Sequence, residues 1–339
     1  MKGPGQLARR PVSLASQDLC TVEPLRDGQP LPLMVRPSVA GVSLSAWLTN
    51  NRELIETRLL EHGGILFRNF TVSGPEEFEA CVKSLSGELV EYTYRSTPRK
   101  RVAGNIYTST EYPPDRAIPL HNEMSYSRSW PLKIWFFCVT PAEEGGETPI
   151  ADSRQVFRRI PAPIRERFAA RGVAYVRNYG YGLDLSWQEV FQTSDRTEVE
   201  RICREAGIEL QWRGDDRLTT RQVCQAIADH PKTGEPLWFN QAHLFHVSSL
   251  DPAARALLEQ LPEDELPRTA CYGDGTSIEP SALEAIRAAY DETAIRFPWQ
   301  QGDLLLLDNM LMAHGRRPFR GPRKVLAGMA ERFGAPAVL

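Results

Sequence analysis

A histidine and a glutamate stand two residues apart in the triplet His-Asn-Glu at 121–123. On an extended strand, side chains i and i+2 point to the same face, so His121 and Glu123 would lie side by side. An imidazole and a carboxylate are two of the three ligands in the facial triad that binds non-haem iron(II). The third ligand must come from elsewhere, and His314, which follows a buried apolar run, is the best candidate. Such a triplet also occurs on ordinary surface loops, so the rest of the sequence must decide whether it binds a metal.

Two further segments could contribute to the same cavity. Thr148 lies just past the tight turn at 145–146, from which its hydroxyl can point back toward the ligands, although a plain hairpin turn would look the same. Arg323 opens an apolar run after His314, whereas Arg320 is expected to be a solvated turn residue. A guanidinium binds a carboxylate through a planar pair of hydrogen bonds, which a lysine cannot reproduce.

The other histidines are weaker candidates for metal binding. His243 and His246 form a His-x-x-His pair, but no acid or third ligand follows at the spacing of a metalloprotease. Asn240 and His243 are expected to line or support the mouth of the site. His62 and His230 are expected to be structural. The sequence contains neither a Gly-x-Ser-x-Gly nor a Walker motif, so hydrolase and nucleotide-phosphate functions lack a basis.

Hydrophobic periodicity indicates the elements that must position these side chains. Short apolar runs predict strands at 65–67, 134–139, 237–240, 304–307 and 325–333. Helical spacing predicts helices at 44–62, 75–85, 156–171, 196–206, 251–261 and 280–296. We expect an irregular N-terminal arm over 1–35 and a single domain over 36–339, with a helical insertion at about 155–235.

The composition is that of an ordinary globular protein, with 339 residues, 42% of them hydrophobic, and a net charge of −3. No long basic block indicates nucleic-acid binding, and no apolar stretch approaches the roughly 20 residues of a membrane span. The start of the chain does not resemble a secretory signal. Six cysteines occur without a Cys-x-x-Cys pair, as is typical of reduced thiols in a cytoplasmic protein.

Four segments together resemble a known family. They are HNEMSYS at 121–127, WPLKIWFFCVTPAEEGGETPIADSR at 130–154, WFNQAHLFH at 238–246, and WQQGDLLLLDNMLMAHGRRPFRGPRKVLAG at 299–328. Over about 65–333 the chain resembles the taurine dioxygenase and clavaminate synthase-like superfamily. It looks closest to the branch that hydroxylates amino acids in peptide natural-product pathways, such as the syringomycin-type aspartyl hydroxylases. Most of the superfamily has aspartate where this chain has Glu123, and that branch has glutamate.

The resemblance implies an iron(II)- and 2-oxoglutarate-dependent dioxygenase domain that uses O₂ and releases succinate and CO₂. His121, Glu123 and His314 would bind Fe(II), while Thr148 and Arg323 would bind the distal carboxylate of 2-oxoglutarate. A one-residue slip in the alignment would give the role of Arg323 to Lys324. Halogenases of the superfamily have a small residue in place of the carboxylate ligand, so Glu123 argues against halogenation. Desaturation and ring closure use the same ligands and stay open.

The resemblance also implies a β-rich α+β fold. Its core would be a double-stranded β-helix (a jelly roll, cupin-like) with flanking helices. The iron ligands come from both strand groups, 90–150 and 235–333, so the two groups must meet in space. Antiparallel sheets stacked face to face would provide the cavity between them. The insertion would lie outside this core or over its mouth.

The substrate is expected to be an amino acid, either free or attached to a carrier protein. Possible substrate contacts are Asn105, Tyr107, Asn240, His243 and Arg316, and the arginines at 95, 99, 101, 316 and 317 could grip a carboxylate or an acidic carrier surface. These arginines could equally be solvated surface charges. A homo-oligomer is compatible with the sequence. An inactive binding protein on a cupin-like barrel is the alternative from another class, and iron stoichiometry with succinate formation would distinguish the two.

Overall fold

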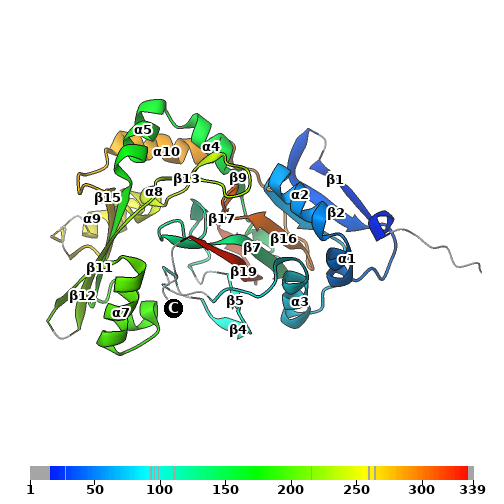
Figure 1. Cartoon of the computed structure of the whole chain (residues 1–339), viewed down its shortest axis with the longest axis horizontal. Coiled ribbons are helices and arrows are strands. Elements are labelled where there is room, and N and C mark those ends of the chain that lie inside the picture. Colours follow the sequence, from blue (N-terminus) through cyan, green and yellow to red (C-terminus); the bar gives the residue numbers. More distant parts are fainter. Residues whose placement is uncertain are drawn as a thin grey trace, which may run out of the picture.

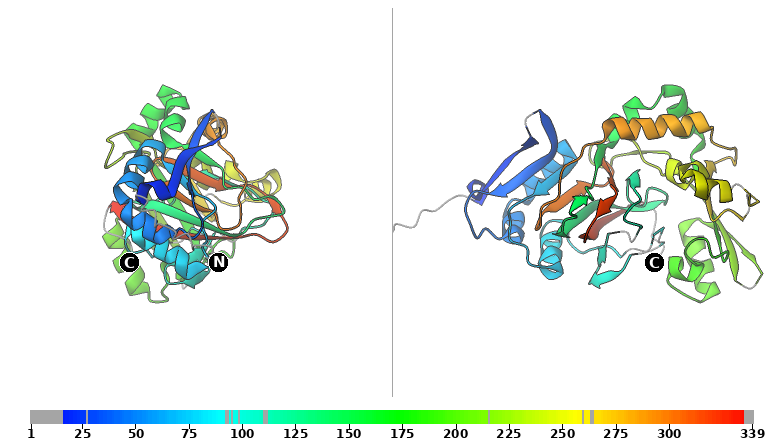
Figure 2. Two further views of the ribbon diagram at one scale, coloured as in Figure 1. Left: turned by 90° about the vertical axis from the view of Figure 1, so that its right-hand side faces the viewer. Right: turned by 180° about the vertical axis from the view of Figure 1, so that it is seen from behind.

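The structure is a computed structural model that describes residues 16–26, 28–91, 94, 96–97, 99–109, 112–214, 216–258, 260–262 and 265–334. Three groups of elements follow one another across the molecule (Figure 1). An N-terminal hairpin with three helices lies at one end, and a four-stranded sheet with helices lies at the other. The strands that carry His121 and His314 lie between these ends, as the reverse view also shows (Figure 2).

The central element is an eight-stranded sheet in which β7 pairs with β16 on one side and β19 on the other. Its strands, in spatial order, are β1 Cys20–Arg26, β2 Gln29–Pro37, β3 Gly64–Phe67, β16 Leu304–Asp308, β7 Ser129–Thr140, β19 Lys324–Gly334, β5 Ile106–Thr108 and β4 Arg101–Ala103. All neighbours are antiparallel except β2 and β3. The strands predicted at 65–67, 134–139, 304–307 and 325–333 are confirmed.

Successive side chains of β7 point to opposite faces of this sheet. Trp135 and Phe137 pack with the N-terminal helices α1 Leu44–Asn50, α2 Arg52–His62 and α3 Pro75–Ser86. Ile134 and Phe136 belong to the other hydrophobic cluster, which surrounds the histidines of interest. The sheet therefore separates a packed helical layer from the layer in which the site lies.

A smaller three-stranded sheet, in the order β6-β17-β9, lies in that second layer. Its strands are β6 Ile118–His121, β17 Met312–Arg316 and β9 Ile150–Asp152. β8 Glu144–Gly145 and β18 Phe319–Arg320 form a separate antiparallel pair. In sequence, β8 precedes β9 and β18 follows β17. Because β6 and β17 pair directly, the two predicted strand groups meet in space, as expected.

The predicted irregular arm over 1–35 is wrong where the structure describes it. After a 3-10 turn at Ser16–Leu19, β1 and β2 form an antiparallel hairpin on the edge of the large sheet. The prolines of this stretch make it look irregular in sequence. Pro24 lies in the edge strand β1, and Pro30 and Pro32 precede the part of β2 that pairs with β3, so their missing N–H groups are tolerated. Residues 1–15 of the predicted arm lie outside the described residues.

Two predicted helices are each split in two. The helix expected at 44–62 breaks at Asn51, whose side-chain amide donates to the carbonyl of Trp47 and whose backbone φ is −123°. The helix expected at 156–171 becomes α4 Ser153–Arg159 and α5 Ala162–Arg171. The break is at Ile160 because the following proline disfavours helical backbone at that residue.

The insertion is not purely helical, which corrects the prediction for 155–235. It contains α6 Trp187–Phe191 and α7 Arg196–Ala206, but also an antiparallel sheet in the order β11-β12-β10-β15. These strands are β11 Glu209–Arg213, β12 Arg217–Cys224, β10 Val173–Tyr179 and β15 Arg268–Tyr272, so the sheet includes a strand from beyond residue 235. In β12 buried residues alternate with more exposed ones, a pattern that in sequence looks like a charged surface segment.

The remaining elements enclose the site from the side of the insertion. They are β13 Ile227–Asp229, β14 Pro236–Trp238, α8 Ala242–Phe245, a 3-10 turn at Val247–Ser249, α9 Pro252–Leu258 and α10 Pro280–Thr293. Within the part of the chain that is described, no helix combines the length and the hydropathy needed to cross a membrane.

Candidate metal centre and its two cavities

His121 and His314 are cross-strand partners in the small sheet. His121 is the last residue of β6, and it lies opposite His314 in the register of β6 with β17. Directly opposed residues of antiparallel strands have adjacent side chains. The two imidazole rings are accordingly 4.6 Å apart between centroids, and the edge of the His314 ring packs on Phe136. Backbone pairing thus brings together two ligands that are far apart in sequence.

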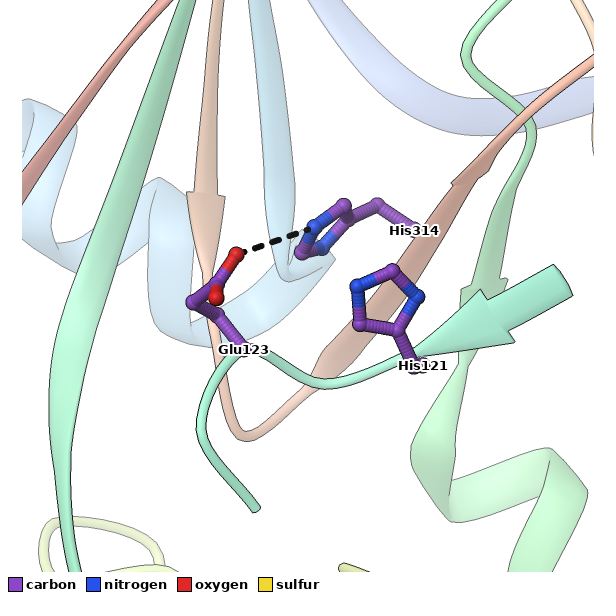
Figure 3. Close-up of side chains that lie close together, drawn as sticks. All are labelled: His121, Glu123 and His314. Carbon is purple, nitrogen blue, oxygen red and sulfur yellow. Dashed lines mark ion pairs between the residues drawn. The ribbon is translucent and has the colours of Figure 1, made fainter. Parts of the chain in front are cut away.

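Glu123 reaches the same point from a turn, not from a strand. The expectation that 121–123 is extended is wrong, because β6 ends at His121 and Met124 has a φ of 58°. The Glu123 carboxylate still points at the imidazoles, with Oε2 at 3.8 Å from Nε2 of His314 (Figure 3). One possible ligand atom from each of the three residues lies within 4.8 Å of the others. No other such group occurs among the residues that the structure describes.

A buried amide holds the turn that carries Glu123. The side chain of Asn309 accepts a hydrogen bond from the Glu123 N–H at 2.7 Å and donates to the carbonyls of Glu123 and Pro131. Asn122 donates in return to the Asn309 carbonyl at 2.7 Å. The sequence analysis missed Asn309, whose only local signal is its place between a buried strand and the segment leading to His314.

An arginine contacts the carboxylate of the group. NH2 of Arg99 donates to Oε2 of Glu123 at 2.7 Å, and both side chains are buried. Burial by itself raises the pKa of the Glu123 carboxyl, but Arg99 and the two histidines outweigh it and hold this pKa well below its ordinary value. Glu123 is therefore ionised. The expectation that Arg99 grips a substrate carboxylate is not supported by this contact.

A histidine that binds a metal must be neutral, and the surroundings of His121 favour that form. Burial, followed by the nearby His314, lowers the pKa of His121 to about 3. Nδ1 of His121 lies 2.8 Å from the carbonyl of Pro119, and a proton there leaves Nε2 with its lone pair facing the group. Nδ1 of His314 is buried with no hydrogen-bond partner among the described residues. Two imidazoles and one carboxylate fit the donor set of non-haem iron(II).

A small cavity opens on one side of the three residues. It is lined by Arg99, Ser109, Ile118, His121, Phe136, Thr148, His314, Gly315, Arg316, Arg323, Val325 and Ala327. Thr148 and Arg323 therefore lie in one cavity with the two histidines. Oγ1 of Thr148 accepts from the indole of Trp299, and Nε of Arg323 donates to the carbonyl of Gly146. Burial lowers the pKa of Arg323 to about 10, which still leaves it cationic near neutral pH.

Lys324 differs from Arg323 in its exposure. It is the first residue of β19 and its side chain is exposed to solvent, whereas Arg323 lines the small cavity. Of the two cations that sequence alignment could exchange, Arg323 is the one positioned to meet a ligand beside the histidines.

A second, larger cavity of about 760 Å³ also reaches the candidate ligands. Arg99 and His121 line both cavities, and Glu123 lines the larger one. Its volume is within the range of cavities that hold small molecules. Residues of the insertion and of α8 and α9 form much of its wall. The three candidate ligands therefore lie where two cavities meet, so one ligand in each cavity could approach a bound metal.

The residues proposed for substrate contact are mostly elsewhere. Arg316 lines the small cavity, but its guanidinium donates to the carbonyls of Tyr112, Pro113 and Arg116 and so fixes that loop. Asn105 lines neither cavity; it lies in the turn between β4 and β5. These positions do not support a role for either residue in substrate binding.

Three further proposed contacts are buried in the core and also line neither cavity. Tyr107 is buried in β5, and the amide of Asn240 donates to the carbonyl of Ala226. Nε2 of His243 lies 2.9 Å from the carbonyl of Leu120. His243 thus supports the residue preceding His121, and does not contact a ligand itself.

His62, His230 and Arg101, which the sequence analysis also named, line neither cavity beside the candidate ligands. His230 is buried against Asp308, and His62 ends α2, so both are structural as expected. Arg101 donates to the carbonyl of Gly104 and to Asn105 at the surface. The position of Arg95 lies outside the described residues.

Comparison with known proteins gives one family over most of the chain. Residues 25–330 match the family described as taurine catabolism dioxygenase TauD, TfdA family. The dapdiamide synthesis protein DdaC of Enterobacter agglomerans is 40% identical over 311 residues, which cover 91% of this chain and 94% of that protein. A clavaminate synthase-like protein of Arabidopsis thaliana is 30% identical, with coverage of 90% and 95%.

Solved structures have the same fold at low identity. The PvcB protein of Pseudomonas aeruginosa superposes with a TM-score of 0.56 at 16% identity, and 95% of each chain is covered. A taurine dioxygenase from Burkholderia xenovorans superposes with a TM-score of 0.53 at 16% identity, covering 92% of this chain and 89% of that one. At these identities the likeness supports the fold alone.

Proposed function

The chain belongs to the TauD, TfdA family of dioxygenases, and on that premise we propose that it hydroxylates an unactivated C–H bond of an amino-acid substrate. It is an iron(II)- and 2-oxoglutarate-dependent dioxygenase that uses O₂. We propose a substrate that is a free amino acid or an aminoacyl group on a carrier protein. The similarity to a protein named for dapdiamide synthesis supports a role in natural-product biosynthesis.

The observation that carries this proposal is the convergence of His121, Glu123 and His314 at the junction of two cavities. We propose that these three side chains bind the iron. When bound, iron(II) with 2-oxoglutarate and O₂ supplies the oxidising power for C–H hydroxylation, with release of succinate and CO₂. The protein supplies the orientation of both organic ligands and limits the access of water.

We assign 2-oxoglutarate to the small cavity and the substrate to the large one. Arg323 is a partly buried cation in the small cavity, and Thr148 lines the same cavity, so the two can bind a carboxylate together. The larger cavity has the volume for an amino-acid-sized molecule. This arrangement puts the substrate and the cosubstrate in two different cavities that share His121 in their walls.

We further interpret the core as a double-stranded β-helix. The large sheet and the small β6-β17-β9 sheet carry residues that line one cavity, as a jelly roll requires. We also propose a cytoplasmic location, since all six cysteines are free thiols and five of them are buried.

Three alternatives use part of the same evidence. Desaturation or ring closure would need the same ligands and the same two cavities, so product analysis must separate them from hydroxylation. An inactive binding protein is disfavoured, because it would have no need for two imidazoles and an ionised carboxylate whose possible ligand atoms lie within 4.8 Å of one another. The presence of Glu123 at the ligand position also disfavours halogenation.

The test begins with the purified chain, Fe(II) and 2-oxoglutarate without oxygen. We expect one iron per chain and a visible charge-transfer absorption that requires both additions. With O₂ and a substrate, succinate should form. His121→Ala, Glu123→Ala and His314→Ala should each lose iron and turnover while retaining the circular dichroism of the fold. Turnover above a few per cent of wild type in His314→Ala, at saturating iron, would remove this residue from the ligand set.

A further inference from the structure

The wall of the larger cavity carries an ion pair that the proposed function does not use. Arg268 is the first residue of β15, and Asp184 lies in the loop before α6. Nε and NH2 of Arg268 both donate to Oδ2 of Asp184, with 2.8 Å from Nε. Both residues line the cavity that also reaches His121 and Glu123. The pair is only partly exposed, at 29% for Arg268 and 14% for Asp184.

Three contacts fix the orientation of the Arg268 guanidinium. Besides the bonds to Asp184, its NH2 donates to the carbonyl of Ser96 at 3.3 Å. Its plane lies over the ring of Phe245, with 5.4 Å from the guanidinium carbon to the ring centroid. NH1 makes no hydrogen bond to any residue within the described part of the chain. The guanidinium is thus anchored along one edge and has a donor available on the other.

The acids in the same cavity have no comparable capacity to bind a ligand. Oδ1 of Asp184 already accepts from the backbone N–H of Leu185. Glu189 accepts from both the backbone N–H and the hydroxyl of Ser186, in the cap of α6. Glu123 is bound to Arg99. Arg268 therefore offers a positively charged donor to this cavity, and the best partner for such a donor is an anionic oxygen.

The cavity that contains Arg268 also bounds the size of the ligand. A sphere of the cavity's volume is on the order of 11 Å across. Arg268 and the pair His121 and Glu123 belong to one cavity wall, contributed by different elements. A molecule that binds Arg268 through a carboxylate can therefore present a carbon several bonds away to the proposed iron.

We infer that Arg268 binds the free α-carboxylate of an amino-acid substrate and that Asp184 holds the guanidinium in place for it. This inference rests on the proposed function and selects one of its two substrate classes. A free amino acid has the carboxylate that Arg268 requires. An α-aminoacyl thioester on a carrier protein has a neutral carbonyl in the same place, so the ion pair between carboxylate and guanidinium is lost.

The probes are a panel of free L-amino acids and the methyl ester of each. Binding is read from the change each compound makes in the visible absorption of the anaerobic Fe(II)–2-oxoglutarate complex, and turnover is read from succinate. We expect at least one acid to bind and to stimulate succinate formation, and its ester to bind at least about tenfold more weakly.

Arg268→Gln should raise the KM of that acid at least about tenfold, with a much smaller effect on kcat and on the KM of the ester. Arg268→Lys retains the charge and should fall between wild type and Arg268→Gln. Arg221→Gln is the matched control. Arg221 pairs with Glu209 and donates to the carbonyl of Gly273 in the same insertion sheet, but does not line the cavity. The KM of the Arg221→Gln variant for the same acid should equal that of wild type.

Several results would overturn the inference. One is equal binding of acid and ester to wild type, a comparison that needs no variant to fold. Others are an unchanged KM in Arg268→Gln, or turnover of a carrier-bound thioester when no free acid is turned over. An Fe(II)–2-oxoglutarate complex that responds to no free amino acid would also overturn it, leaving the reaction class intact. Failure of the proposed function looks different, because then the Fe(II)–2-oxoglutarate absorption itself would be absent.

Discussion

The side chain of Asn309 makes two opposite hydrogen bonds with the backbone of Glu123. It accepts from the Glu123 N–H at 2.7 Å and donates to the Glu123 carbonyl at 2.9 Å. This pairing imitates a strand partner at the point where β6 has already ended. The turn that presents the carboxylate is thereby joined to the segment that leads into β17 and His314.

Asn309→Ala should weaken metal binding although it removes no ligand. Loss of the amide leaves buried N–H and C=O groups without partners, which costs about 1–3 kcal/mol of unfolding free energy. Residues that orient ligands typically contribute about 10–100-fold to metal affinity. Calorimetric titration with Mn(II) measures the affinity. Asn51→Ala removes another buried amide, at the junction of α1 and α2, and should lower Tm only. Equal Mn(II) affinity in Asn309→Ala and wild type would contradict this.

Arg323→Ala should raise the KM for 2-oxoglutarate far more than the KM for the substrate. Loss of a buried charge-assisted pair with a carboxylate costs on the order of 2–5 kcal/mol. Steady-state succinate formation at varied 2-oxoglutarate measures the change. Lys324→Ala is the control, because Lys324 is the adjacent cation but is exposed. If Lys324→Ala has the large effect and Arg323→Ala does not, the assignment to the small cavity is wrong.

Arg99→Gln should make the protein's stability more dependent on metal. In the metal-free protein, the ionised Glu123 loses its buried positive partner, and breaking such a pair costs about 3–5 kcal/mol. A divalent cation restores positive charge beside Glu123, so Mn(II) should raise the Tm of this variant more than that of wild type. Arg68→Gln breaks a buried pair with Asp303 away from the ligands. Its Tm gain from Mn(II) should match wild type, and a matching gain in Arg99→Gln would refute the prediction.

His243 should make the protein less stable in mild acid. Burial lowers its pKa from 6.5 in the unfolded chain to about 4 in the folded protein. Between these values the unfolded state binds more protons, so the free energy of unfolding falls as the pH falls. From pH 6.5 to about pH 5 the loss is about 2 kcal/mol for this one group. Urea unfolding at both pH values should give a smaller difference for His243→Gln, whose amide can still donate to Leu120. If His243→Gln loses as much unfolding free energy between the two pH values as wild type does, His243 is not the group responsible.

The ligand residues could be predicted from sequence better than the geometry that unites them. The residue types at 121, 123 and 314 pointed to iron, yet the argument from an extended strand was wrong for Glu123. What places Glu123 is Asn309, which lies 186 positions away in the chain. A contact of this range leaves no local periodicity. The sequence predicted the geometry of the site only in outline. It indicated that the two strand groups meet, because the proposed ligands come from both.

The insertion and the cavity walls were harder to predict for a related reason. β10 lies between β12 and β15 in a sheet assembled from distant segments. The polar residues of β12 occupy its less buried face, and in sequence they resemble a charged surface segment. Arg268 likewise gave no signal, since its chemistry depends on Asp184, Ser96 and Phe245, each from another segment.

The division of the ligands between sheet and turn has a consequence for how such a site can diverge. The two histidines are fixed by a backbone register, so moving either would disturb β6, β17 and β9 together. The third position lies outside that ladder and is held through its backbone, by Asn309, whatever its side chain. Mutation at residue 123 can therefore exchange the third donor while the scaffold is inherited unchanged. In this architecture, the chemistry of the metal can evolve through a single codon.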